Sequence, residues 1–144
     1  MPYYAHSGSS EEKADWQLLR DHLVGVAERA AKIGRKLGFE RAAYIAGLLH
    51  DLGKYSLEFQ RRLEGANIAV EHSTAGAKML LERAQGADRF IAELIVYCIL
   101  GHHAGLPDRQ NETDACYDRR LARPVNIAPV WEQELPIDLS GLMP

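Results

Sequence analysis

The feature that most constrains the fold is a helical hydrophobic pattern in residues 15–37. Apolar side chains recur there in alternating steps of three and four, which places them on one face of an α-helix. They are Trp16, Leu19, Leu23, Val26, Ala30, Ile33 and Leu37. Gly38 follows the last of them, and glycine at this position commonly ends a helix. The pattern predicts a long helix that buries one stripe against its neighbours.

The following segments favour the same fold class. Residues 40–52 contain the apolar run AAYIAGLL, which predicts a short helix buried on most sides. Further helices are expected over residues 56–63, 73–85 and 88–100, and Ser73 is a suitable N-cap. In the last of these helices the residues expected to face the core are Ile91, Leu94, Ile95 and Cys98. Because no alternating strand pattern and no repeat is visible, we predict an all-α fold, a compact helical bundle.

The two ends of the chain carry weaker patterns. After Gly105 the sequence is polar and interrupted by Pro107, Pro124, Pro129 and Pro136. We expect one short helix near residues 113–121 and an otherwise irregular tail over residues 106–144. The N-terminal segment around His6 is also expected to be irregular, with that side chain exposed. The length of 144 residues then predicts a single domain over residues 1–144, with its helical core at about residues 15–105.

Composition excludes some classes of protein. No apolar run approaches a membrane span, and the N-terminus lacks the pattern of a secretion signal, so we expect a cytoplasmic protein without membrane contact. Cys98 and Cys116 have no metal-ligand spacing and are expected to be reduced thiols, the first of them in the core. The net charge of −3 gives no general attraction for nucleic acid, so a polyanion must be drawn by a local site.

Five of the six histidines lie at ends or edges of the expected helices. A charged Asp51 directly after the buried run AAYIAGLL is informative, because a buried carboxylate is normally paired or bound to a metal. Helical bundles commonly build metal sites from side chains on facing helices. The conjunction therefore favours a metal site formed by Asp51 with the five histidines, which are His22, His50, His72, His102 and His103.

Taken singly, each of these residues has a plainer interpretation. His22 suits a hydrogen-bonded core histidine, and His72 suits a residue of a surface loop. Lys54, one turn after Asp51, is either an exposed lysine or a cation that contacts phosphate, and its position favours the second. A small basic cluster in the tail is expected to be a solvated face, with contact to a nucleic-acid backbone as the alternative. The cluster consists of Arg119, Arg120 and Arg123.

The chain resembles the HD superfamily of metal-dependent phosphohydrolases. Within that superfamily it resembles the HD nuclease domain of the CRISPR-associated helicase-nuclease of type I systems, including its stand-alone form. The resemblance covers about residues 4–107 in order and spacing. Its matching pieces are Ala5-His6-Ser7, His22 within LLRDHLVGVA, His50-Asp51 within LLHDLGK, His72 within EHSTAGA, and GHHAGLP from Gly101 to Pro107.

The resemblance implies a helical domain that degrades single-stranded DNA with two divalent metals, together with a CRISPR helicase domain or subunit and a surveillance complex. By this resemblance, His22, His50 and Asp51 hold the first metal. The second is held by His72, His102 and His103, with Asp51 as the bridging ligand. The resemblance gives the catalytic roles to Asp51 and to Lys54, which positions or neutralises the scissile phosphate.

The implied chemistry agrees with the residue types. Imidazole-rich ligation favours Mn, Fe, Co or Ni, and Mg is possible. A metal pair can activate water without a side-chain nucleophile, and no serine or cysteine stands beside these histidines. Because ligand histidines must be neutral, activity is expected to fall below about pH 6.

One departure from the family pattern concerns the first metal. The family completes that site with an Asp on a helix well beyond the GHH motif, and none of the later aspartates matches it. They are Asp108, Asp114, Asp118 and Asp138. The departure predicts either a chain that continues beyond Pro144 or a first metal that is weakly held or absent. It keeps open two alternatives, an HD phosphohydrolase acting on nucleotides or other phosphate esters and an inactive helical docking module.

Overall fold

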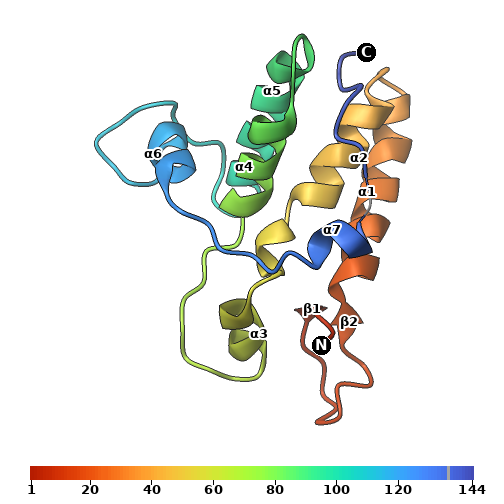
Figure 1. Cartoon of the computed structure of the whole chain (residues 1–144), viewed down its shortest axis with the longest axis vertical. Helices are drawn as coiled ribbons and strands as arrows, with labels where there is room; N and C mark the ends of the chain where they lie inside the picture. The colour runs from red at the N-terminus through yellow and green to blue at the C-terminus, as the bar shows by residue number, and fades with distance from the viewer. Residues whose placement is uncertain (136) are drawn as a thin grey trace.

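Two helices joined by a tight turn form one wall of the protein (Figure 1). In the computed structural model, which describes residues 1–135 and 137–144, they are α1 (Leu19–Arg35) and α2 (Glu40–Leu49). Gly38 adopts a φ of 77°, and the Phe39 N–H donates to the Gly34 carbonyl at 2.9 Å. This left-handed glycine closes the end of α1, as the sequence predicts, and directs the chain back along it.

The buried face of α1 differs from the expected one. Its buried residues are Leu19, Leu23, Ala27, Ala31 and Gly34. Ile33 and Leu37, which the pattern places in the core, are exposed. The reason is the close approach of α2, since a Cβ on Gly47 would lie 2.8 Å from the Ala27 Cα. Small residues therefore occupy the contact, and the larger aliphatic side chains lie beside it.

A small sheet precedes the helices and was not predicted. Strand β1 (Tyr4–His6) pairs antiparallel with β2 (Gln17–Leu18), and α1 consequently begins at Leu19 rather than near residue 15. Strands this short show no alternation of hydrophobicity, which explains why the sequence did not reveal them. The expectation of an irregular segment around His6 was wrong, although its side chain is exposed as expected.

A second pair of helices faces the first. A 3₁₀ turn (Leu52–Lys54) and α3 (Leu57–Leu63) follow α2, and α4 (Thr74–Arg83) then packs against α5 (Asp88–Gly101). These helices confirm the predicted segments and the all-α fold class. Figure 1 shows α4 and α5 side by side, with their connection at the far end from α3.

The face that α5 buries is shifted from the expected one. Ile95 is buried as predicted, but Leu94 is exposed. Cys98 is also exposed, so its expected place in the core was wrong. The residues that α5 buries are Ala92, Ile95, Val96, Ile99 and Leu100. This helix is apolar on most of its circumference, so its sequence fits several faces and the packing of α2 and α4 selects one.

The C-terminal tail is mostly non-helical, as predicted, and is nevertheless anchored. It contains α6 (Tyr117–Ala122), close to the expected short helix, and α7 (Trp131–Glu134), which the sequence did not indicate. Figure 1 shows the tail, in blue, running from α6 to α7 and on towards the ends of α1 and α2. Pro136 lies outside the described residues. The tail side chains buried in the core are Tyr117, Trp131, Leu135, Leu139 and Leu142.

None of the helices among residues 1–135 and 137–144 has the length and apolar character that crossing a membrane requires.

Candidate metal centre

Asp51 is the point on which the predicted histidines converge. Asp51 is only 4% exposed and lies between the end of α2 and the 3₁₀ turn. Each of its two carboxylate oxygens faces a different set of ring nitrogens. The structure thus divides the cluster into two groups that share one carboxylate.

The first group surrounds Asp51 Oδ2. His22, in the first turn of α1, places its Nε2 at 3.1 Å, and His50, directly after α2, places its Nε2 at the same distance. The Lys54 ammonium lies 2.9 Å from the same oxygen. Two imidazoles and one carboxylate are therefore available on this side.

The second group surrounds Asp51 Oδ1. The Nε2 atoms of His102, His72 and His103 lie 3.2, 3.4 and 4.0 Å from it, respectively. His72 precedes α4, whereas the other two follow α5, so the packing of α4 on α5 assembles this group. The Nε2 atoms of His72 and His103 are 2.8 Å apart. The His103 side chain is 56% exposed, so this side of the cluster opens to solvent.

Backbone carbonyls at two helix ends orient two of the rings. His50 Nδ1 lies 2.6 Å from the Gly47 carbonyl, and His102 Nδ1 lies 2.6 Å from the Ile99 carbonyl. Carbonyls in the last turn of a helix lack an intrahelical donor, so each can accept from the Nδ1–H of a histidine that follows. When Nδ1 donates in this way, a neutral ring keeps its lone pair on Nε2, on the side of Asp51, where it can bind a metal. In the metal-free protein a proton on Nε2 instead lets the ring donate to the Asp51 carboxylate.

The donor set fits divalent metal ions. Ring nitrogens lie about 2.1 Å from a bound ion, so two ligands at right angles are about 3 Å apart. Three separations in the second group, of 2.8, 3.2 and 3.4 Å, match this spacing, and the fourth, between His103 and Asp51 Oδ1, is longer at 4.0 Å. Nitrogen lone pairs and carboxylate oxygens that face one another are all acceptors, and a cation satisfies them together. Both groups can therefore hold a metal, and the assignment of individual ligands stays a prediction.

The charges around Asp51 shift the ionisation of the cluster. Burial alone would raise the pKa of Asp51, but its contacts with His102, His22, His50 and His72 outweigh burial and hold that pKa far below its usual range. The contact with Asp51 raises the pKa of His102. Burial and the neighbouring His102 and His72 lower the pKa of His103. Asp51 is consequently a permanent anion at the centre of the cluster.

Lys54 is buried, at 5% exposure, so its interpretation as an exposed lysine is excluded. Its Nζ donates to the Ala5 carbonyl at 3.2 Å and lies 2.9 Å from Asp51 Oδ2. The ammonium therefore joins strand β1 to the centre of the cluster. Contact of Lys54 with a phosphate stays a prediction.

His6 lies close to the cluster but outside both groups. Its ring packs edge-on against that of His22, with centroids 5.0 Å apart. Burial, followed by the charge of Lys54, lowers the pKa of His6. The side chain is a neutral neighbour of the first group.

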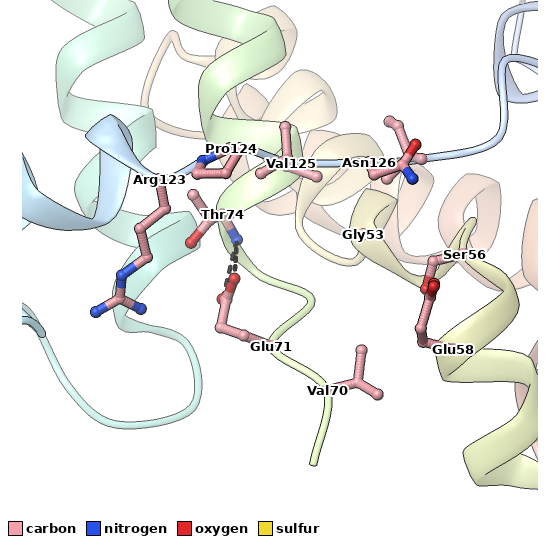
Figure 2. Close-up of a pocket in the computed structure, with 12 residues that line it drawn as sticks. Gly53, Ser56, Glu58, Val70, Glu71, Thr74, Arg123, Pro124, Val125 and Asn126 are labelled. Carbon is pink, nitrogen blue, oxygen red and sulfur yellow. Dashed lines mark hydrogen bonds between the residues drawn. The ribbon is translucent and has the colours of Figure 1, made fainter. Parts of the chain in front are cut away.

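The start of α4 is capped by a residue that the sequence did not single out. Ser73 has helical backbone angles and its side chain does not cap the helix, so its expected role was wrong. Instead, the Glu71 carboxylate accepts from the backbone N–H of Ser73 at 2.8 Å. It also accepts from the backbone N–H of Thr74 at 3.0 Å, which Figure 2 shows. A carboxylate is favourable at a helix N-terminus, and Glu71 directly precedes His72.

The basic cluster of the tail is solvated only in part. Arg119 and Arg123 are exposed, as predicted. The Arg120 side chain is 11% exposed and bonds to Ser73, directly before α4, and to Leu100 in α5. The interpretation of Arg120 as part of a solvated face was wrong. No sequence signal distinguished it, because an arginine in a polar tail carries no periodicity.

Two cavities lie on either side of residues 70–74. One, of about 340 Å³, borders the second group and is lined in part by His72, His103, Arg120 and Arg123. The other, of about 240 Å³, lies between residues 70–74 and the tail and contains none of the histidines (Figure 2). The first cavity is therefore the one that adjoins the proposed chemistry.

The later aspartates lie elsewhere in the described part of the chain. Asp118 accepts from Arg109 at 3.0 Å, and Asp138 accepts from the Ser140 hydroxyl. Neither group around Asp51 includes a second carboxylate from residues 1–135 or 137–144. The first group consequently offers three protein ligands and the second offers four.

Comparison with known families gives one match. The HD domain family matches residues 19–137, which includes every residue of the two groups. No match was found among curated proteins.

Proposed function

Because the chain belongs to the HD domain family, whose members are metal-dependent hydrolases, we propose that it is a nuclease that cleaves single-stranded DNA in CRISPR interference. The observation that carries the proposal is the division of the histidines into two groups on the two oxygens of Asp51. The runs LLHDLGK and GHHAGLP, which supply most of these residues, support the nuclease branch of the family. We further propose a CRISPR helicase domain or subunit and a surveillance complex as partners, in the cytoplasm.

The residues around Asp51 divide the work of hydrolysis. His22, His50 and Asp51 would hold one divalent ion, and Asp51 with the second group would hold another. Such ions, when bound, supply an activated water and stabilise the charge that develops on phosphate oxygens. Asp51 anchors both groups through its buried charge, and Lys54 adds a cation beside it that can attract a phosphate. The exposure of His103 leaves the second group accessible to a strand that approaches from solvent.

A second candidate is an HD phosphohydrolase that acts on free nucleotides. The cavity beside His72 and His103 favours it, because about 340 Å³ lies within the range of small-molecule sites. Arg120 and Arg123 on its wall offer positive charge to a phosphate. The two candidates share the same metal chemistry and differ in substrate.

One experiment separates these candidates. The purified chain is freed of metal, reloaded with Mn, Fe, Co, Ni or Mg, and incubated with single-stranded DNA, duplex DNA and nucleotides. Metal-dependent cleavage of single-stranded DNA that is lost in Asp51→Asn and His102→Ala supports the nuclease. Turnover of nucleotides alone would favour the second candidate. Absence of any metal-dependent turnover would leave a helical docking module. Arg119→Ala changes an exposed side chain of α6, and as the matched control it should retain activity.

A further inference from the structure

The rings of the second group are not all oriented in the same way. His102 is fixed by its own Nδ1, which bonds to the Ile99 carbonyl. His72 has no such bond, because its Nδ1 is buried without a hydrogen-bond partner among the described residues. The direction of the His72 ring therefore depends on the backbone that flanks it.

That backbone is held from two sides. Gly53 approaches it so closely that a Cβ there would lie 2.1 Å from the His72 carbonyl oxygen. On the other side, Glu71 accepts from the N–H groups of Ser73 and Thr74. These two hydrogen bonds hold the residues that directly follow His72 against the Glu71 side chain that precedes it.

Arg120 connects this cap to the helix that carries the other two histidines. Its Nη1 donates to the Leu100 carbonyl at 2.7 Å, two residues before His102. Its Nη2 donates to the Ser73 hydroxyl at 2.7 Å and to Glu71 at 3.3 Å, on either side of His72. One guanidinium from the tail thus bonds to both segments that present the second group.

From this geometry we propose that Arg120 is a positioning residue that sets the spacing between His72 and the His102–His103 pair, and thereby the affinity of the second metal. The planar fork of a guanidinium can satisfy a carbonyl, a hydroxyl and a carboxylate in fixed directions, which a lysine cannot do. The inference rests on the proposed metal binding of the two groups. It adds that α6, beyond the matching motifs, completes the second group.

The size of the expected effect follows from how metal sites respond to their outer contacts. Loss of a group that orients a ligand typically costs about 10–100-fold in metal affinity. Among the described residues, the side-chain hydrogen bonds of Arg120 reach neither α1 nor the end of α2, where His22 and His50 lie. Arg120→Met should therefore lower the affinity for the second metal by about 10–100-fold and leave the affinity for the first nearly unchanged.

The test is a titration of the metal-free full chain with Co²⁺, followed by calorimetry and by the visible absorption of the bound ion. Arg120→Met should show one weakened binding step with an altered spectrum and one unchanged step. Arg120→Lys should recover the affinity only in part. Arg119→Met is the matched control, because Arg119 lies on the same helix, is exposed, and should give the unaltered titration.

A second variant keeps the test decisive if Arg120→Met does not fold. Ser73→Ala removes the hydroxyl that accepts from Arg120 and donates to Glu71, and it should weaken the same binding step by a smaller factor. The proposal would be overturned if both variants bound Co²⁺ in two steps with the affinities of the unaltered chain. It would also be overturned if both binding steps were weakened equally. If the unaltered chain binds no Co²⁺, the metal binding on which the proposed function depends is refuted, and this inference is refuted with it.

Discussion

At the scale of single residues, the proposed chemistry depends on one buried charge. Both carboxylate oxygens of Asp51 face imidazoles. Because the carboxylate is buried, its ionised form is stable only when positive charge lies beside it. Sequence motifs located this residue and its histidines, because they stand at helix ends in recognisable runs. They did not locate Glu71 or Arg120, whose importance arises only from contacts between segments distant in sequence.

Substitution of Asp51 tests the shared carboxylate. Asp51→Asn keeps the shape of the side chain and removes its charge, so both groups should lose their metals. We expect a loss of affinity greater than the roughly 10–100-fold caused by outer contacts. The measurement is metal bound per chain after dialysis. His6→Gln is the control, since it changes an imidazole outside both groups and should keep the metals. Retention of both metals by Asp51→Asn would refute the bridging role.

Substitution of Lys54 tests its buried ammonium. Loss of one partner of a buried ion pair typically costs about 3–5 kcal/mol. Because Asp51 keeps its histidines, we expect Lys54→Met to lower the free energy of unfolding by only about 2 kcal/mol. Urea denaturation measures this change. Activity should fall while bound metal is retained, and unchanged activity would exclude a role for Lys54 at the phosphate.

At the scale of elements, the helices were predictable and their buried faces were less so. Periodicity identified α1, but the contact with α2 is made by Ala27, Gly34 and Gly47 rather than by its largest aliphatic residues. Hydrophobic patterns favour large side chains, whereas the closeness of two helices is set by small ones. The sequence alone does not say which partner will approach.

A pair of glycine substitutions tests this close contact. In Gly47→Ala the new methyl would lie 2.8 Å from the Ala27 Cα, in backbone that cannot yield easily. We expect a loss of about 1–3 kcal/mol in the free energy of unfolding, as for other overpacked sites. Gly25→Ala on α1 meets nothing within 4 Å and should gain about 0.5–1 kcal/mol from helix propensity. Denaturant melts measure both changes, and equal effects would argue against the tight contact.

Asp88, at the start of α5, links that helix to the end of the chain. Its carboxylate accepts from the backbone N–H groups of Gly141, Leu142 and Met143 at 2.9, 2.8 and 2.8 Å. The hydrogen bond from Met143, aided by those from Gly141 and Leu142, lowers the pKa of Asp88. The stabilisation is therefore present above the unfolded-state pKa of about 3.9 and is lost as the pH falls through the lower pKa of the folded state.

The prediction for Asp88 concerns the amide resonances of residues 141–143. They should keep their positions as the pH falls from 7 to 4 and then move when Asp88 is protonated. In Asp88→Ala they should occupy the displaced positions already at pH 7. Asp21→Ala, an exposed carboxylate in the first turn of α1, is the control and should leave these resonances unchanged. If the amide resonances of residues 141–143 did not change with pH, the anchoring of the tail by Asp88 would be contradicted.

At the scale of the whole molecule, the tail closes the fold over contacts distant in sequence. The Tyr55 hydroxyl donates to Glu134 at 2.9 Å, and the Ala128 N–H donates to the Tyr55 carbonyl at 2.7 Å. Burial and the contact with Glu134 raise the pKa of Tyr55, so its hydroxyl keeps its proton at neutral pH. Such pairings leave no local pattern, which is why the sequence predicted the non-helical character of the tail but not α7 or its buried side chains.

Metal binding should stabilise the whole molecule, because the histidines converge only in the folded chain. A ligand at 100 times its Kd adds about 2.7 kcal/mol when the unfolded chain does not bind it. For a domain of this size that corresponds to a rise in Tm of about 8 °C. Removal of the metal by a chelator should reverse the rise. Scanning calorimetry with and without Mn²⁺ or Co²⁺ measures it.

The dependence of this rise on pH follows from competition between metal and protons. A protonated imidazole has no lone pair for a metal, so the rise in Tm should shrink as the pH falls below about 6.5. The contact with Asp51 raises the pKa of His102 in the metal-free protein, so protons compete there from a higher pH. Activity should decline over the same range. Asp51→Asn should show no rise at any pH. An undiminished rise at pH 5 would mean that the ion is held by groups other than these histidines.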